Sequence, residues 1–303
     1  MRFYPEGIND ALCKNFKNTA QIKAAIASKE IFEGTVRLCD SEHNLYVDLG
    51  CAKGIMPRNE GALGIIEGTV RDIALISKVN KRVCFRVAGF HKNADGELIP
   101  VLSRRSVQLD CLKEYVNSLN CGDIIDARVT RLEPFGAFID IGAGINSLIP
   151  IDMLSVSRIT HPKERLTEGE IIRVALRKRE EEKLTFTLKE LLGTWEENAA
   201  LFSAGETVTG TVRSIETYGA FVELTPNLAG LAEPCEGLKA GMQVSVFIKS
   251  IIPQRMKIKL VIVEAFEQKS RPEPLKYYIN ANRIDEWNYS PPEAQKEIYT
   301  VFN

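Results

Sequence analysis

The sequence predicts an all-β protein made of three small tandem barrels joined by short helices. The first observation behind this prediction is an internal repeat, in which residues 122–141 align with residues 205–224 at an offset of 83 without a gap. The second is a weaker copy that includes Gly34–Arg37 and His43–Gly50. The third is the content of each copy, because short runs rich in β-branched and aromatic residues, separated by glycine, are typical of strands.

The second copy shows the five strands most clearly, and five short strands in about 65–70 residues favour a small closed barrel. In chain order they are expected at 124–130, 136–141, Ser147–Pro150, Ile171–Arg177 and Leu184–Leu188. In the third copy, Gln243–Lys249 and Lys257–Ile262 correspond to the last two strands.

Helical patterns separate the copies. Val107, Leu109, Leu112 and Val116 recur at near-helical spacing. The expected order is an N-terminal helical segment (1–28), a divergent barrel (29–106), a helical spacer (107–120), a barrel (121–190), a spacer (191–203), a barrel (204–263) and an aromatic-rich extension (264–303).

Composition excludes several classes of protein. The 303 residues hold 39 Lys and Arg against 40 Asp and Glu, so bulk positive charge cannot drive binding. No run of about 18 apolar residues predicts a membrane span, and no apolar segment at the start predicts a secretory signal. Seven cysteines without a CxxC pair favour a reduced, cytoplasmic location.

The sequence contains no recognisable catalytic, metal-binding or nucleotide-binding motif. The three histidines lie far apart in the sequence, without the spacing of metal ligands, and there is no P-loop, GxSxG or HExxH sequence. We therefore expect no catalytic residues, no metal, no cofactor and no small-molecule substrate.

The second copy resembles the S1 domain, the RNA-binding OB-fold barrel named after bacterial ribosomal protein S1. The resemblance rests on 135–142, 147–155, Gly169 and Leu184–Lys189, and the third copy matches it over Tyr218–Leu224. It is weaker for the first copy, which ends in the similar run Leu102–Arg105. It implies three S1-type barrels that bind single-stranded RNA, with translation as the setting and the 30S ribosomal subunit as a possible partner.

The resemblance also implies which side chains bind. In the family, both aromatics of the strand-two tetrapeptide lie on the ligand face, where bases stack on them. This carries over to Phe135 and Phe138, to Tyr218 and Phe221, and more weakly to His43 and Tyr46. Strict strand alternation would put residues three apart on opposite faces, so spacing alone does not place both members of a pair outside.

Other family positions differ here. The histidine found on strand three in many members is replaced by Pro57, Pro150 and Glu233, and the arginine near the last hairpin by Lys183 and Lys257. Lysine keeps the charge but loses the bidentate fork of arginine. Phosphate contacts are thus expected from lysine and arginine side chains, namely Arg179, Lys183, Arg213 and Lys257.

The function and the role of the C-terminal extension each leave alternatives open. The divergent barrels could dock protein on the ribosome instead of RNA, or the chain could be an accessory RNA-binding subunit of an RNA-processing complex. The extension could be a hairpin and helix packed on the third barrel, or a docking tail, because Trp287 and its neighbouring tyrosines are favoured anchor residues.

Overall fold

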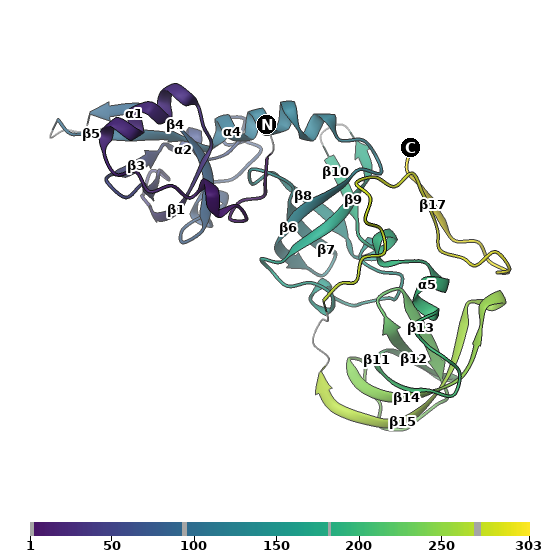
Figure 1. Cartoon of the computed structure of the whole chain (residues 1–303). Coiled ribbons are helices and arrows are strands. Elements are labelled where there is room, and N and C mark those ends of the chain that lie inside the picture. Colours follow the sequence, from purple (N-terminus) through teal and green to yellow (C-terminus); the bar gives the residue numbers. More distant parts are fainter. Residues whose placement is uncertain (1–2, 93–95, 181–182, 270–273) are drawn as a thin grey trace. The chain divides into compact units, whose positions relative to one another are not determined.

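The chain folds into three closed five-stranded barrels with few helices, as expected (Figure 1). This computed structural model describes residues 3–92, 96–180, 183–269 and 274–303. The chain divides into two compact units, one formed by 1–119 with 140–146 and the other by 120–139 with 147–303. None of the helices in the described ranges is long and apolar enough to cross a membrane.

Barrel one, in the first unit, has the strand order β1-β2-β3-β5-β4. Its strands are β1 (Phe32–Cys39), β2 (Leu45–Asp48), β3 (Lys53–Met56), β4 (Arg82–Lys92) and β5 (Leu98–Ser103). The helical elements of this unit are η1 (Asp10–Leu12), α1 (Thr19–Ser28), α2 (Arg58–Gly61), α3 (Ile73–Ile76), α4 (Arg104–Glu114) and η2 (Val116–Ser118). Alternate residues of the strands, such as Val36, Val47 and Leu102, fill the interior.

Barrel two follows with the order β10-β8-β7-β6-β9. Its strands are β6 (Ile124–Glu133), β7 (Gly136–Asp140), β8 (Asn146–Pro150), β9 (Ile171–Glu180) and β10 (Lys183–Thr187). Between β8 and β9 lie two short helices, η3 (Ile151–Met153) and η4 (Pro162–Glu164).

Barrel three repeats this architecture with the order β11-β12-β13-β15-β14. Its strands are β11 (Thr207–Glu216), β12 (Gly219–Thr225), β13 (Leu228–Ala232), β14 (Met242–Ile252) and β15 (Lys257–Lys269), with η6 (Pro253–Arg255) joining the last two. The family resemblance, the repeat and the strand lengths thus predicted the architecture of this part of the chain correctly.

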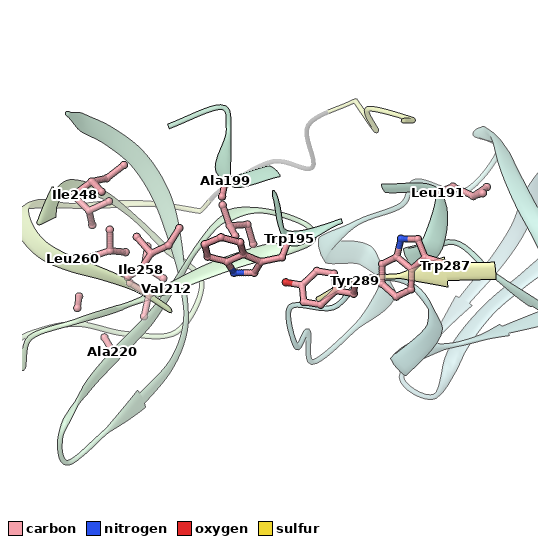
Figure 2. Packing of buried hydrophobic residues seen from close by; sticks show 14 of the residues in the cluster. Leu191, Trp195, Ala199, Val212, Ala220, Ile248, Ile258, Leu260, Trp287 and Tyr289 are labelled. Atoms are coloured by element: carbon pink, nitrogen blue, oxygen red, sulfur yellow. The ribbon is translucent and has the colours of Figure 1, made fainter. Parts of the chain in front are cut away.

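The segment 191–203, expected to be a spacer, contributes side chains to a hydrophobic core. It carries η5 (Lys189–Leu192) and α5 (Trp195–Ala199), and Leu191, Trp195 and Ala199 are buried in the same cluster as the interior of barrel three. Figure 2 shows Trp195 lying beside Tyr289 of the C-terminal extension. The Trp195 amide donates a hydrogen bond to the Tyr289 carbonyl at 3.0 Å.

The extension forms the expected hairpin, β16 (Glu286–Asn288) with β17 (Tyr299–Val301), but residues 274–303 contain no helix. Trp287 and Tyr289 are buried, and their rings lie 5.4 Å apart. The extension also meets the start of β6, where the Ile284 amide donates to the Gly122 carbonyl at 2.9 Å. The aromatic anchors that suggested a docking tail are therefore buried within the chain itself.

Candidate nucleic-acid interface

A Gly-Ala dipeptide lies between the two aromatics of each pair, Gly136-Ala137 in barrel two and Gly219-Ala220 in barrel three. The close approach of two strands requires its glycine. A Cβ placed on Gly136 would lie 2.3 Å from the carbonyl oxygen of Ile149 on β8, and one on Gly219 would lie 2.2 Å from that of Ala232 on β13. Real side chains do not tolerate such distances. Glycine therefore lets β7 and β12 begin directly against their neighbours.

This tight start brings the aromatics of each barrel together. Phe135 and Tyr218 precede the strand, in the turn, and so escape strand alternation. Phe135 is 56% exposed and lies 5.8 Å from Phe138, with the rings perpendicular. Tyr218 is 61% exposed and lies 6.4 Å from Phe221 in the same arrangement. Each pair offers an exposed ring supported edge-on by a partly buried one, which suits base stacking.

The register of barrel three extends this aromatic pair into a row of outward-facing side chains. Cross-strand partners share a face of the sheet. The row runs Ser214, Phe221, Leu231, Lys259 and Ser250 across β11, β12, β13, β15 and β14. Lys259 is exposed, and sequence reasoning missed it. Strand register would have been needed to find it.

Barrel two has the corresponding outward-facing row, but its lysine lies on β9, whereas the lysine of barrel three lies on β15. Phe138 and Leu148 correspond to Phe221 and Leu231 at the repeat offset. Leu148 pairs with Thr185, which in turn pairs with Lys178 on β9. The Lys178 side chain is 64% exposed and forms an ion pair with Glu180. Lys178 was also missed from the sequence.

The row in barrel one has no cation. It consists of Leu38, Tyr46, Ile55, Val101 and Gly89, joined by the pairings of β1 through β5. Leu38 is 55% exposed. This face is consequently more apolar than the corresponding faces of barrels two and three.

In barrel one, carboxylates contact the side chains at the two expected aromatic positions, His43 and Tyr46. The hydroxyl of Tyr46 donates to Asp40 Oδ2 at 3.2 Å, and His43 Nε2 lies 3.7 Å from Asp72 Oδ2. A hydrogen bond from Arg58 lowers the pKa of Asp72. Arg58 balances the charge of Asp72. Asp40 places negative charge beside Tyr46, which disfavours phosphate there.

The four expected phosphate contacts lie in different surroundings. Lys183 and Lys257 are exposed at the ends of the last hairpins, and strand alternation places them on the same faces as Thr185 and Lys259. Arg179 is half-buried, pairs with Leu184, and alternates with Lys178 along β9. The lysines thus lie in line with the aromatic rows, and Arg179 does not.

Arg213 lies in a buried ion-pair network. Its side chain is 10% exposed and binds Glu223 through two hydrogen bonds, from Nε at 2.8 Å and Nη2 at 2.9 Å. Glu164 and Arg165 complete the network. The register of β11 shifts between Val212 and Ser214, so Ser214 takes the outward position and Arg213 does not join the exposed row.

No group of three or more His, Cys, Asp and Glu side chains in the described ranges is arranged to hold a metal ion. The outward rows of barrels two and three combine aromatic rings and lysines with leucine, serine and threonine side chains. Such a surface can bind a flexible, negatively charged chain of aromatic bases.

Comparison with known proteins identifies the central barrel. The family model of the S1 RNA binding domain matches residues 118–186. This segment is an S1 domain. Its limits enclose all but the last residue of barrel two, so the S1 barrel is the one that carries Phe135 and Phe138.

The chain is also similar to curated small ribosomal subunit proteins. It is 31% identical over 243 residues to small ribosomal subunit protein bS1 of Leuconostoc lactis, covering 74% of this chain and 54% of that protein. It is 32% identical over 220 residues to the bS1 homolog of Bacillus subtilis (strain 168), covering 67% and 54%. The chain spans about half the length of these curated relatives.

Among solved structures, a multidomain protein with nucleic acid binding domains from Streptococcus pneumoniae is similar at 13% identity. The match covers 80% of this chain and 75% of that one, with a TM-score of 0.26.

Proposed function

We propose that this chain binds single-stranded RNA through the outer faces of the S1 barrel and barrel three, and acts in translation as a homologue of ribosomal protein S1. The observation that carries the proposal is the exposed, perpendicular aromatic pair found in both barrels, in line with an exposed lysine. The relatives' names supply the setting.

Binding would combine stacking with local charge. A base laid on Phe135 or Tyr218 buries two apolar faces, and such stacking contributes about 1–3 kcal/mol per base. Single strands can splay their bases onto such rings, whereas the bases of a duplex are already stacked. Lysines in the rows then neutralise phosphates on either side of the stacked base.

The near-zero net charge sets the character of the interaction. With 39 basic and 40 acidic residues, the chain has no bulk field to attract RNA. Each barrel alone would bind weakly. Because the S1 barrel and barrel three belong to one compact unit, a strand held by one is presented to the other at high effective concentration.

The test is fluorescence anisotropy with a labelled, unstructured RNA oligonucleotide. The Phe135→Ala/Phe138→Ala variant should bind about tenfold to a hundredfold more weakly than the unmodified chain, because two stacking rings are lost. A matched control is Tyr299→Ala, which removes an aromatic ring that is 63% exposed on β17.

Unchanged affinity in the double variant, or an equal loss in Tyr299→Ala, would contradict the assignment of the face. Duplex RNA of the same composition should bind less tightly than the single strand.

A second candidate function concerns barrel one alone. Its outward row is apolar and has no cation, and Asp40 and Asp72 lie beside the aromatic positions. These observations favour a protein surface over RNA as the partner of this face. On the ribosome, barrel one would then dock while the other two barrels hold RNA.

A further inference from the structure

A cavity of about 240 Å³ lies in the first unit, away from the outward rows. Its walls come from the outer side of β1 and β4, the N-terminal residues, and α4. Most of the lining is apolar, including Phe3, Leu12 and Val107. An engineered cavity of about 150 Å³ admits benzene, so this volume suits a molecule of one or two rings.

One wall of the cavity is polar. The side chain of Glu33 lines it and is 3% exposed. Its Oε1 accepts a hydrogen bond from the Gly7 amide at 3.1 Å. Its Oε2 is buried and has no hydrogen-bond partner among the described residues. A buried carboxylate oxygen without a partner is costly, so this atom requires a donor from outside the chain or a proton.

The buried carboxylate of Glu6 has charged partners, whereas Glu33 Oε2 has no hydrogen-bond partner among the described residues. Glu6 is equally buried, yet Arg104 Nε lies 2.6 Å from its Oε1 and Lys78 Nζ lies 3.0 Å from its Oε2. The unit therefore supplies cations to one buried carboxylate, whereas Oε2 of the other, Glu33, has no hydrogen-bond partner among the described residues and its side chain lines the cavity.

Electrostatics around Glu33 agree with this geometry. Burial raises the pKa of Glu33 to about 7, and the negative charges of Glu6 and Asp140 act in the same direction, against the Gly7 amide and Arg82. Lys14 also lines the cavity, but its Nζ lies 3.5 Å from Glu30 Oε2, so a cation in the cavity would balance the remaining carboxylate, Glu33.

We propose that this cavity binds a small organic monocation with an apolar body, a primary amine on one ring being the simplest case. The ammonium group would donate to Glu33 Oε2, and the ring would lie against Phe3, Leu12 and Val107. The site is independent of the RNA-binding faces, and no reaction is implied.

The experiment is isothermal titration calorimetry of the full chain with benzylamine, with benzyl alcohol as the neutral probe of the same shape. Benzylamine should bind at least about tenfold more tightly, because a hydrogen bond to a charged group is worth more than one to a neutral group. Glu33→Gln should remove this preference and leave both probes equally weak.

Two further variants keep the test informative. Glu42→Gln, which changes an exposed carboxylate that does not line the cavity, should retain the preference for benzylamine. Ala11→Trp should block both probes without altering Glu33, since Ala11 is exposed and lines the cavity.

Equal binding of the two probes to the unmodified chain would overturn the proposal, as would a preference that survives Glu33→Gln or Ala11→Trp. Failure of benzylamine to bind at all would show that the cavity takes only water. RNA affinity is measured separately, so none of these outcomes bears on the proposed RNA function.

Discussion

At the scale of single residues, one irregularity in β11 decides which side chain carries charge on the outer face of barrel three. The register shift between Val212 and Ser214 takes Arg213 out of the outward row and into its pair with Glu223. Lys259, on a different strand, is in register with Leu231 and remains exposed. A cation next to the aromatic motif in sequence is therefore not the one next to it in space.

This difference predicts opposite phenotypes for two cation-removing substitutions. Lys259→Gln should weaken RNA binding and reduce the slope of log affinity against log salt by about 0.7, the value for one phosphate contact on a single strand. Arg213→Gln should leave the slope unchanged and lower stability by about 3 kcal/mol, because it removes the ion pairs with Glu164 and Glu223 from a buried network and leaves Arg165 to balance both carboxylates. Anisotropy between about 50 mM and about 200 mM salt, with urea unfolding of both variants, measures these quantities. A reduced slope in Arg213→Gln would show that this side chain does reach phosphate.

Some residues of the candidate site belong to a local sequence motif, and others do not. Phe135, Phe138, Tyr218 and Phe221 belong to a repeated tetrapeptide, and the family resemblance implies that both aromatics of each copy lie on the ligand face. Their role in RNA binding stays a prediction. Lys178 and Lys259 lie on strands far along the chain, and only pairing between strands brings them into line. A single sequence does not give that pairing.

At the scale of elements, the strands and longer helices followed from composition and spacing, and the burial of the segment between barrels two and three did not. The expected helix near 107–116 is present as α4, and the strands of the repeat lie where the repeat puts them. The segment at 191–203 is expected to be a spacer because it is a short helical stretch between two barrels. It is buried because Trp195 and Leu191 enter a core to which the distant Trp287 also belongs. Such a contact has no local signal.

The Gly-Ala dipeptide gives a prediction at this scale. Gly136→Ala should lower the stability of the chain by about 1–3 kcal/mol, because the new methyl group would force β7 away from the Ile149 carbonyl 2.3 Å distant. Gly89→Ala is the matched control, since no atom lies within 4 Å of a Cβ at that position in β4. Thermal or urea unfolding compares the two. Equal midpoints would mean that the approach of β7 to β8 is not tight in solution.

At the scale of the whole molecule, three copies of one architecture differ in what their outer faces present. The S1 barrel and barrel three pair an exposed aromatic with lysine, whereas the corresponding row of barrel one is apolar with carboxylates nearby. A repeat that duplicates the fold therefore need not duplicate the partner. The length and net charge of the chain gave no indication of this difference, because opposite local charges cancel in the sum.

This division of roles predicts that ribosome binding and RNA binding separate by barrel. Leu38→Glu adds charge to the exposed apolar row of barrel one, so it should weaken co-sedimentation with 30S subunits and leave affinity for free single-stranded RNA unchanged. Phe135→Ala/Phe138→Ala should weaken RNA affinity at least about tenfold and affect co-sedimentation less. Both variants change exposed or partly exposed positions, so both should fold, which circular dichroism checks. If each variant reduces both activities to the same extent, barrel one shares the RNA-binding surface, and its apolar row does not define a separate docking site.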